Sequence, residues 1–542
     1  MWNANEKKYF SEPISVETVS TRVNKTGLWR FLTPIRKEKV SPCRSLCPLE
    51  NGIPRWMNEV KEGNWEEAWN IMREYNPFPA IIGYTCYQFC LEKCSRALYD
   101  EAIAIGEVEK KIGLWRHNNY EPKKSVPVKG NSKKVVIVGS GPAGLSCAFY
   151  LNMLGVSVTV LEKLPVAGGL LATGIPEYRL PRDILRKELE ILQEDGIVIK
   201  TDYEVRADDL PNLQDNFDAV LFAVGAQESK SLHIKGEDLP GVTGGVEFLR
   251  DLHLGKLGEV QGRVIVIGGG NAAVDAACAA SRNGAEEVTL LYRRCEDEIP
   301  AHPDEIKAAR EAGVNFIFET VVEEIIGEGR VQKVRAEKTA LSRRGEDLTV
   351  LAGTEFYLDC NLIISAVGQE SKLSEVAPFI SRESSGKSAF NMEEVSGRAP
   401  LVFAAGDAVT GPSSVAGAIF SGREAALNLI SLLEQGKESS ESVRIASSLE
   451  GKEEIVGFES LNSALYSRQK RFALPHEEAG RCFNCGLCSK CGVCWIYCPD
   501  LSVDGLSGDY EFLLDYCKGC GICVTECPTG VLTMEEVVSD GA

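Results

Sequence analysis

Two stretches of sequence, VVIVGSGPAGL at 135–145 and VIVIGGGNAAV at 264–274, decide the fold of this chain. Each consists of a β-branched apolar run, a glycine-rich turn and the start of a helix. This pattern is typical of a parallel strand that leads into a helix whose free N–H groups face a pyrophosphate. Because the pattern occurs twice, the sequence predicts two Rossmann-like dinucleotide-binding domains in one chain.

The middle of the chain alternates short β-branched runs with longer amphipathic stretches, which indicates an α/β fold with parallel sheets. Outside this region, the first 125 residues are polar, contain Trp and Cys, and show helical patterning at 53–60 and 66–74. The predicted strands lie at 134–138, 156–162, 219–223, 264–267, 288–292, 362–366 and 401–405.

The first glycine-rich turn, 139–144, has the residues that a dinucleotide-binding site needs. Gly139 permits the tight turn, Gly141 lets the backbone approach the pyrophosphate, and Gly144 lets the helix pack on the strand. Glu162 ends the next strand, where a carboxylate can accept hydrogen bonds from ribose hydroxyls. Far downstream, Asp407 follows another strand, just before an apolar helix from about residue 414, and can face a ribityl chain or phosphate. Together these two regions indicate FAD.

The second turn, 268–273, is a GxGxxA variant of the same device. Its next strand ends in Tyr292-Arg293-Arg294 rather than in an acidic residue. An acidic residue would bind the 2′-hydroxyl of NAD, whereas arginine suits the 2′-phosphate of NADP. We therefore favour NADPH; the alternative is that both arginines form surface ion pairs and the chain uses NADH.

Longer segments give a family resemblance over about residues 40–430. GG-L at 168–170, GIPEYRLP at 174–181, GGGNAAVDAA at 268–277, GAEEVTLLYRR at 284–294, AVGQ at 366–369 and VFAAGDAVTGPSSVAGAI at 402–419 resemble the small subunit of glutamate synthase. The large subunit of NADH-dependent ferredoxin:NADP oxidoreductase and the N-terminal part of dihydropyrimidine dehydrogenase are similar. The resemblance implies FAD in the first site and NADPH or NADH in the second.

The turns and the resemblance together nominate a set of cofactor-binding residues. These are Gly139, Gly141, Pro142, Ala143, Gly144, Glu162, Lys163, Gly169, Leu170, Arg179, Gly225, Gly268, Gly270, Asn271, Ala272, Ala273, Arg293, Arg294, Gly368, Gly406, Asp407, Ser414 and Ala416.

Nineteen cysteines are many for a chain that we expect to be cytoplasmic, where clustered cysteines more often bind metal than form disulfides. We expect Cys147, Cys278, Cys295 and Cys360, which are scattered through the middle, to be ordinary core or surface residues. The others fall in two groups, one toward each end of the chain.

The C-terminal group contains a duplicated C-x2-C-x2-C-x3-C-P run, the pattern of a bacterial two-cluster ferredoxin. In that pattern the fourth cysteine of each run ligates the other cluster. We therefore expect one [4Fe–4S] cluster on Cys488, Cys491, Cys494 and Cys527, and the other on Cys517, Cys520, Cys523 and Cys498. A zinc site would need only four ligands.

The N-terminal group fits the resembled family only in part. It consists of Cys43, Cys47, Cys86, Cys90 and Cys94. The two-cluster form of the family has a further C-x2-C pair upstream, but this chain has no cysteine before Cys43. The family pattern implies one cluster on Cys47, Cys86 and Cys90, with Glu109 of the IGEVE segment as fourth ligand. We expect one N-terminal [4Fe–4S] cluster, with Cys94 or Cys43 as rival fourth ligands.

Cys482 and Cys485 extend the first C-terminal run but exceed the eight ligands that two clusters require. They could be free thiols, alternative ligands or part of a zinc site, and the spacing does not decide between these. The tail as a whole is similar to that of the flavoprotein partner of dissimilatory sulfite reductase and of related NADPH:iron–sulfur oxidoreductases of anaerobes.

The predicted layout has six parts. They are a helical Fe–S domain (1–125), an FAD-binding domain in two parts (130–255 and 366–435), a NAD(P)-binding domain (256–365), a linker (436–475) and a ferredoxin domain (476–542).

The net charge of −19 argues against nucleic acid and anionic lipid as partners. With no apolar signal-peptide core and no apolar stretch of membrane-spanning length, we expect a cytoplasmic chain without membrane insertion.

These features predict an enzyme that takes hydride from NAD(P)H onto FAD and passes single electrons through [4Fe–4S] clusters. No side chain need act as acid or base in the hydride step. The acceptor would be ferredoxin or a redox-enzyme partner, in a hetero-oligomeric complex, and the reaction could run in reverse. The alternatives are a glutamate synthase small subunit and an electron-relay subunit of a larger complex such as sulfite reductase.

Overall fold

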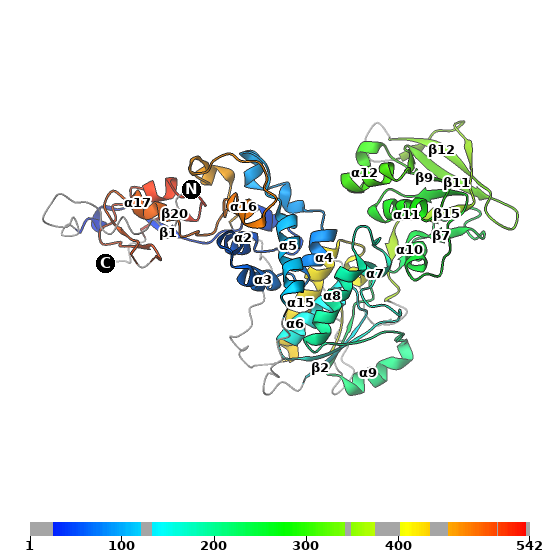
Figure 1. Cartoon of the computed structure of the whole chain (residues 1–542), viewed down its shortest axis with the longest axis horizontal. Helices are drawn as coiled ribbons and strands as arrows, with labels where there is room; N and C mark the ends of the chain where they lie inside the picture. The colour runs from blue at the N-terminus through cyan, green and yellow to red at the C-terminus, as the bar shows by residue number, and fades with distance from the viewer. Residues whose placement is uncertain are drawn as a thin grey trace. The chain divides into compact units, whose positions relative to one another are not determined.

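The computed structural model describes residues 25–120, 133–341, 348–373, 401–433, 454–506 and 508–537. The described residues form two compact units (Figure 1). The central unit contains residues from 69–88 and 106–448. The end unit contains residues from 1–68, 89–105 and 449–542, so it combines segments from both ends of the chain.

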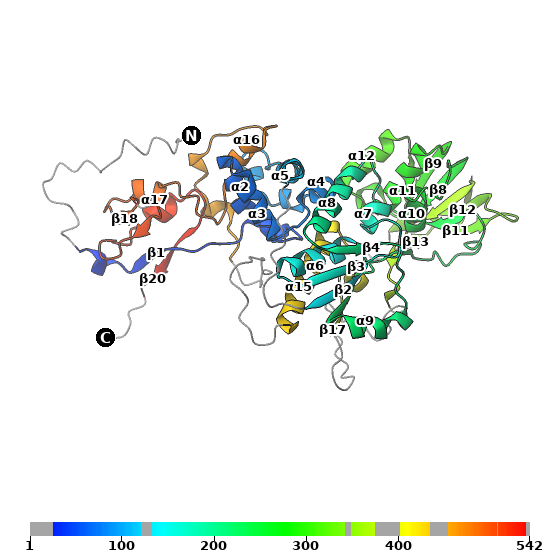
Figure 2. The same ribbon diagram turned by 60° about the horizontal axis from the view of Figure 1, so that its bottom comes forward.

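The first glycine-rich turn lies on a five-stranded parallel sheet of the central unit. The strand order is β17 (Leu401–Ala404), β5 (Ala219–Phe222), β2 (Lys134–Val138), β3 (Ser157–Leu161) and β4 (Val198–Lys200). Residues 135–138 of β2 are all buried, as expected for a strand of a parallel sheet covered on both faces. Helix α6 (Pro142–Met153) follows β2, and α15 (Val415–Leu433) packs against it (Figures 1 and 2).

The second turn lies on another five-stranded parallel sheet. Its order is β10 (Asn315–Ile317), β9 (Glu287–Leu291), β8 (Arg263–Ile267), β15 (Leu362–Ser365) and β7 (Val242–Gly244). Helix α11 (Asn271–Arg282) follows β8, and α10 (Gly245–His253) and α12 (Pro303–Glu311) pack against α11. The buried alanines of α11 form much of the core on this side. The predicted α/β fold with two Rossmann-like domains is confirmed.

An antiparallel sheet adjoins the second parallel sheet in sequence. It consists of β11 (Thr320–Ile326), β12 (Lys333–Leu341), β13 (Leu348–Val350) and β14 (Phe356–Asp359), with β12 paired to the other three. The short strands β6 (Glu228–Ser229) and β16 (Gln369–Glu370) pair where the chain passes between the two parallel sheets. The remaining helices of the central unit include α4 (Pro79–Thr85), α7 (Leu170–Thr173), α8 (Arg182–Glu194), α9 (Leu210–Asn216) and α14 (Asp407–Thr410), with most of α5 (Ile105–Asn118).

The end unit has little regular structure. Its N-terminal part has β1 (Leu32–Arg36), α1 (Pro42–Leu46), α2 (Ile53–Glu62), the first residues of α3 (Trp65–Arg73), and the 3-10 turns η4 (Phe89–Leu91) and η5 (Ser95–Leu98). Its C-terminal part has α16 (Pro475–Gly480), α17 (Val493–Ile496), β18 (Val503–Asp504), β19 (Glu511–Phe512), α18 (Ile522–Thr525) and β20 (Leu532–Glu536).

Segments from the two ends of the chain pair directly within the end unit. Strand β1 runs antiparallel to β20, with Leu32 opposite Glu536 and Arg36 opposite Leu532. Helix α16 packs against α2, as both ribbon views show (Figures 1 and 2). Part of the region predicted as a linker, from Glu454 on, belongs to this unit and contains the 3-10 turns η8 (Phe458–Ser460) and η9 (Ser463–Leu465).

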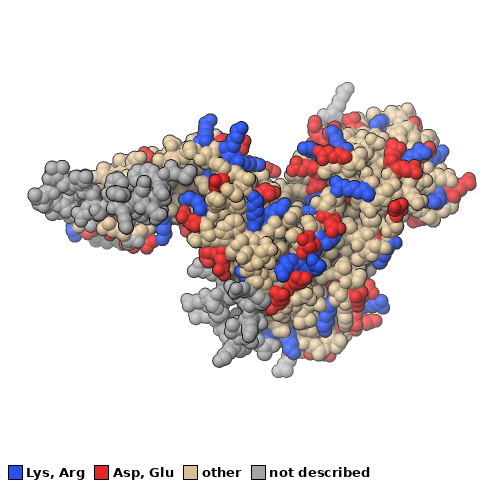
Figure 3. All heavy atoms as spheres, viewed as in Figure 1, with Lys and Arg blue, Asp and Glu red and all other residues tan. Residues whose placement is uncertain are grey.

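Charged side chains of both signs are interspersed on the described surface drawn in Figure 3. The negative net charge is therefore not gathered into one patch on that face. Across the described ranges, none of the helices combines the length and the apolar character needed to cross a bilayer.

Candidate active site and cluster sites

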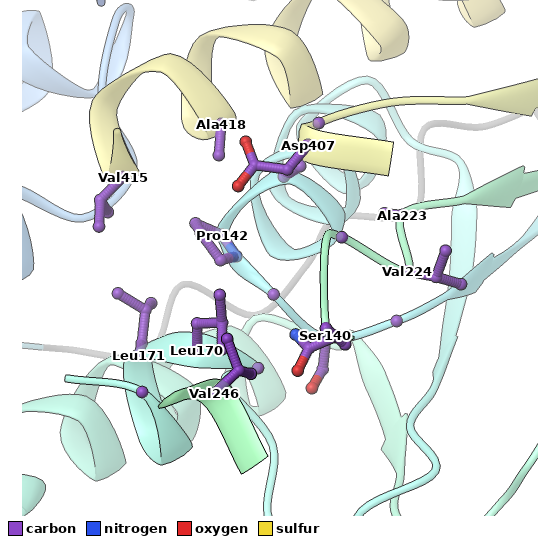
Figure 4. A pocket seen from close by; sticks show the side chains of 18 of the residues that line it. Ser140, Pro142, Leu170, Leu171, Ala223, Val224, Val246, Asp407, Val415 and Ala418 are labelled. Atoms are coloured by element: carbon purple, nitrogen blue, oxygen red, sulfur yellow. The ribbon is translucent and has the colours of Figure 1, made fainter. Parts of the chain in front are cut away.

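A cavity of about 440 Å³ in the central unit brings the two glycine-rich turns together. Residues 139–143 of the first turn line it, as do Asn271 and Ala272, which begin the helix after the second turn. Figure 4 shows Ser140 and Pro142 of the first turn around this space with Leu170, Val246 and Asp407. One cavity is thus lined by both predicted dinucleotide sites, which lie more than a hundred residues apart in sequence.

The first turn has the close backbone contacts that its glycines were expected to allow. Gly139 has φ +106°, and a Cβ there would lie 2.4 Å from the carbonyl oxygen of Ala223. A Cβ on Gly144 would lie 2.1 Å from the carbonyl oxygen of Gly139, so helix α6 can lie this close to the turn only with glycine at 144. By contrast, a Cβ at Gly141 would have no neighbour within 4 Å. That open side is where a pyrophosphate could approach the backbone.

Glu162 fixes the shape of this turn from the end of β3. Its Oε2 accepts hydrogen bonds from the Ser140 backbone N–H (3.0 Å) and hydroxyl (2.6 Å), and its Oε1 accepts from the Leu164 N–H (2.9 Å). The Ser140 hydroxyl in turn accepts from the Gly168 N–H at 3.0 Å. Glu162 is buried yet lines the cavity. The carboxylate expected to bind ribose therefore also holds the turn and the following glycine pair in place.

Asp407 begins α14 and lines the cavity near Pro142 and Ala418 (Figure 4). Burial raises the pKa of its carboxyl, although the hydrogen bond from the Ser413 hydroxyl to Oδ1 (2.7 Å) acts in the other direction. Gly406 precedes it with φ +71°, and the Gly406 N–H donates to the Ser421 hydroxyl at 2.8 Å. The segment after β17 is thus anchored to helix α15 and directs a carboxyl group at the cavity.

The second turn is closed by the loop that follows β9. The His302 N–H donates to Asn271 Oδ1 at 2.8 Å, and the Ala301 N–H donates to the Gly269 carbonyl at 3.1 Å. A Cβ on Gly269 would lie 2.4 Å from the ring of Tyr292, so only glycine allows this packing. A Cβ at Gly270 would meet nothing within 4 Å, which leaves that side open as at Gly141.

The two arginines after β9 differ in their surroundings. Arg293 is exposed, and within the described ranges its guanidinium forms no ion pair. Arg294 is half-buried and pairs with Glu298, with 3.6 Å between Nη1 and Oε1. Of the two, Arg293 therefore has the guanidinium that is available to a phosphate.

A buried ion cluster joins the two Rossmann-like domains beside the cavity. Arg179 Nη1 lies 2.6 Å from Asp275 Oδ2, its Nε lies 2.9 Å from Glu305 Oε1, and its Nη2 donates to the Tyr87 hydroxyl at 3.3 Å. Burial raises the pKa of Asp275 to about 6, although Arg179 acts to lower it. Arg179, Asp275 and Tyr87 all line the cavity.

The C-terminal cysteines lie close together in the end unit, and their division between two clusters stays a prediction. Burial, followed by the charges of Cys491, Cys488 and Cys527, raises the pKa of Cys494 to about 12. Cys527 and Cys523 are buried in one packed group, and Cys488 and Cys494 pack against it. A small cavity is lined by the other four cysteines, Cys498, Cys517, Cys520 and Cys523.

Two of the predicted N-terminal ligands, Cys86 and Glu109, lie in the central unit. Burial raises the pKa of Cys86 to about 11, and the charge of Glu109 adds to this rise. Glu109 is 5% exposed, and its Oε1 accepts from Asn76 Nδ2 at 2.9 Å. Burial raises the pKa of Glu109 to about 7, although that hydrogen bond acts to lower it. Cys47 and Cys90 belong to the end unit, where α1 packs against η4.

Known protein families match three regions of the chain. The family model described as pyridine nucleotide-disulphide oxidoreductase matches residues 133–422, which is more than half of the chain. The chain belongs to this family. Two further models match its ends: dihydropyrimidine dehydrogenase domain II with a 4Fe–4S cluster at 37–120, and a 4Fe–4S binding domain at 510–533.

Curated relatives place the chain among glutamate synthase small-subunit-like oxidoreductases. It is 35% identical to the NADP(+)-dependent formate dehydrogenase subunit beta of Moorella thermoacetica over 74% of this chain and 61% of the relative. It is 34% identical to the NADPH-Fe(3+) oxidoreductase subunit beta of Geobacter sulfurreducens, over 75% of this chain and 67% of that relative. It is also 34% identical to the glutamate synthase [NADPH] small chain of Escherichia coli, over 72% of this chain and 88% of that relative. The chain thus spans 61% and 67% of the length of the first two relatives. Among solved structures, FprA of Mycobacterium tuberculosis aligns at a TM-score of 0.46 and 22% identity, over 58% of this chain and 87% of FprA.

These findings confirm the expected family, the enzyme class and the cofactor types. The chain is an NAD(P)H-dependent flavin and iron–sulfur oxidoreductase with FAD and with [4Fe–4S] domains toward both ends.

Most of the residues nominated from sequence line the cavity, and others lie outside it. The lining residues are Gly139, Gly141, Pro142, Ala143, Glu162, Lys163, Gly169, Leu170, Arg179, Gly225, Asn271, Ala272, Gly406, Asp407 and Ser414. The nominated residues outside it are Gly144, Gly268, Gly270, Ala273, Arg293, Arg294, Gly368 and Ala416. Other lining residues, among them Tyr87, Asp275, Val246 and Gln369, were not predicted from the sequence. Asp275 lies on the same helix face as Asn271, four residues earlier, and this spacing could have pointed to it.

Proposed function

We propose that this chain oxidises NADPH and delivers single electrons through its [4Fe–4S] clusters to a redox protein partner, and that the reaction also runs in reverse. The observation that carries this proposal is the cavity of about 440 Å³ lined by residues of both glycine-rich turns. FAD, when bound there, supplies the exchange between the two-electron chemistry of a nicotinamide and the one-electron chemistry of clusters.

The residues of the cavity are suited to bind and orient the two nucleotides. The open side of Gly141 and the N-terminus of α6 would hold the FAD pyrophosphate, and Asp407 would face the ribityl chain or phosphate. Asn271 would lie at the nicotinamide nucleotide, since it begins α11 at the edge of the same cavity. In this account the protein contributes position and electrostatics, and no side chain acts as acid or base.

Arg293 supports NADPH over NADH as the substrate. It is exposed and follows the strand after the second turn, where arginine can bind a 2′-phosphate. The names of the relatives point the same way, because the formate dehydrogenase subunit is described as NADP(+)-dependent and the others as NADPH enzymes. We therefore propose Arg293 as the main 2′-phosphate ligand, with Arg294 beside it.

Two of the relatives are subunits of larger enzymes, which supports a protein acceptor within a hetero-oligomeric complex. The duplicated ferredoxin run at the C-terminal end would be the outlet toward that partner.

A second candidate is a glutamate synthase small subunit, favoured by the 88% coverage of the Escherichia coli small chain. The 4Fe–4S binding domain at 510–533 argues for the first proposal, because it adds an electron outlet of its own. Copurification with a large glutaminase-bearing chain would favour the second candidate.

The experiment is to measure anaerobic oxidation of NADPH and of NADH with a viologen acceptor in three full-length proteins: wild type, Arg293→Ala and Arg263→Ala. Arg263 is the control, because it is an exposed arginine whose partner is the exposed Asp359. Loss of a charge-assisted contact worth about 1.5–3 kcal/mol should raise the KM for NADPH roughly 10- to 150-fold in Arg293→Ala. The KM for NADH should be unchanged. If the wild type oxidised neither nucleotide, the proposed function would be wrong. If Arg293→Ala kept a normal KM for NADPH, only the role of Arg293 would be wrong.

A further inference from the structure

Four cysteines from three separate segments meet in the end unit, and two of them are the pair left over from the ferredoxin run. Cys43 lies on α1, Cys94 directly precedes η5, and Cys482 and Cys485 follow α16. Cys485 Sγ donates to the hydroxyl of Ser95, the neighbour of Cys94, at 3.4 Å. The leftover pair therefore lies beside an N-terminal cysteine rather than in the ferredoxin groups.

The electrostatic interactions among these thiols agree with that placement. Burial raises the pKa of Cys43, and the charges of Cys482, Cys485 and Cys94 raise it further, against a hydrogen bond to Ser41. Burial likewise raises the pKa of Cys482, with added contributions from Cys485 and Cys94. Each of the four thiols thus lies within electrostatic range of others in the group.

Backbone hydrogen bonds hold the leftover pair against the N-terminal segments on one side. The Lys39 N–H donates to the Gly486 carbonyl at 3.0 Å, next to Cys485. A Cβ on Gly486, which has φ +75°, would lie 2.4 Å from the Lys39 carbonyl oxygen. This close approach brings the loop after Cys485 to the segment that leads into α1.

A buried ion network holds the pair on the other side. Arg96 Nη1 donates to the Arg481 carbonyl at 3.1 Å, and Arg481 Nη2 donates to the Glu101 carbonyl at 2.6 Å. Arg481 also pairs with Glu478 (2.7 Å) and Asp100 (3.0 Å), and both arginines are at most 2% exposed. Buried charges are costly unless they are paired and hydrogen-bonded, so this network fixes Arg481, and with it the adjacent Cys482, in one position.

We propose that Cys482 and Cys485 join Cys43 and Cys94 as the four thiolate ligands of an additional [4Fe–4S] cluster. A cubane cluster takes one thiolate on each of its four irons, which four cysteines from three segments can supply. Over the described part of the chain, no three His, Cys, Asp or Glu side chains lie close enough together to hold a single metal ion. A cubane is larger than one ion and holds its ligands further apart.

This assignment accounts for every cysteine in the two terminal groups. Cys86 is influenced by Glu109 rather than by these four thiols, so the remaining N-terminal ligands stay available for a separate cluster. Only two residues separate Cys485 from Cys488, the first ligand of the ferredoxin run. The additional cluster would therefore adjoin the ferredoxin clusters along the chain.

The test is the iron, sulfide and zinc content of the anaerobically purified full-length chain, with native mass spectrometry to count clusters. Three proteins are compared: wild type, the double variant Cys482→Ser/Cys485→Ser, and the control Cys295→Ser, a half-buried cysteine outside both terminal groups. The proposal predicts about sixteen irons per wild-type chain, from four clusters, and about twelve in the double variant. FAD content should be equal in all three proteins, and the control should match the wild type.

A wild-type content of about twelve irons, or stoichiometric zinc, would overturn the proposal. So would a double variant that keeps the wild-type iron content. If the double variant lost FAD or failed to fold, the iron and zinc contents of the wild type would still decide whether the additional cluster exists. None of these readouts depends on NADPH oxidation, so the proposed function can fail or hold independently.

Discussion

At the scale of single residues, Arg179 is a buried cation that joins the two Rossmann-like domains through Asp275 and Glu305. Its side chain is 10% exposed, and its partners Asp275 and Glu305 are 7% and 14% exposed. Burial raises the pKa of both carboxyl groups, and Arg179 opposes that rise. Because the folded-state pKa of Asp275, about 6, lies above its ordinary value of 3.8, this carboxyl lowers the free energy of unfolding as pH rises through that interval.

We expect Arg179→Met to destabilise the central unit by about 3 kcal/mol at pH 8, because it leaves two buried carboxylates without their cation. The loss of stability caused by Arg179→Met should be smaller at pH 5. Without Arg179 the pKa of Asp275 rises further, so at that pH the group takes up a proton and loses its charge. The measurement is the thermal unfolding midpoint of the full chain at both pH values, followed by FAD fluorescence.

Arg263→Met is the matched control, because its ion pair with Asp359 is exposed and contributes at most about 1 kcal/mol. An equal loss at pH 5 and pH 8 in Arg179→Met would contradict the role given to the buried carboxyl groups.

At the scale of elements, the flavin site depends on the close contact of two helices. Helix α15 approaches α6 so closely that a Cβ on Gly422 would lie 2.1 Å from the Ala143 carbonyl oxygen. The Ser146 hydroxyl of α6 donates to the Ile419 carbonyl of α15 at 2.8 Å. Since α6 presents its N-terminus to the cavity, the position of α15 sets where the pyrophosphate would bind.

Gly422→Ala should therefore weaken FAD binding. Adding a methyl group to so close a contact costs about 1–3 kcal/mol of free energy. If that free energy is lost from FAD binding, the Kd for FAD rises roughly 5- to 150-fold. Gly258→Ala is the control, since a Cβ there has open space and the φ needs no glycine. The Kd is measured by FAD fluorescence on reconstitution of the apoprotein; an unchanged value in Gly422→Ala would contradict the helix contact.

The elements predictable from sequence were those with strong local signals. The expected strand at 134–138 coincides with β2, and the one at 264–267 lies within β8, because buried parallel strands read as continuous apolar runs before a glycine turn. The antiparallel strands β11 and β12 were not foreseen, since charged residues interrupt both.

The contacts that could not be predicted join residues far apart in sequence. The pairing of Tyr87 and Asp275 with Arg179 depends on how two domains pack, which no local pattern records. The same holds for Cys482 and Cys485, whose x2 spacing resembles the ferredoxin run. Only the fold shows that Cys485 lies at Ser95, beside Cys94.

At the scale of the whole molecule, the chain combines a nucleotide-binding central unit with an end unit built from both of its cysteine-rich ends. Strand β1 pairs with β20 across almost the full length of the sequence. The N-terminal and C-terminal cysteines that we assign to clusters thus share one unit, except for Cys86. In the proposed function, electrons from NAD(P)H leave the chain through the ferredoxin run, along a path that ends there.

The most direct test of that path removes one ligand at its end. The full-length Cys520→Ser variant, holding its other cofactors, is compared with wild type and Cys295→Ser for NADPH-driven reduction of ferredoxin and for bleaching of the bound flavin by NADPH. The account predicts that Cys520→Ser still bleaches its flavin with NADPH but no longer reduces ferredoxin, while Cys295→Ser does both. Undiminished ferredoxin reduction by Cys520→Ser would contradict the claim that electrons leave through the C-terminal clusters.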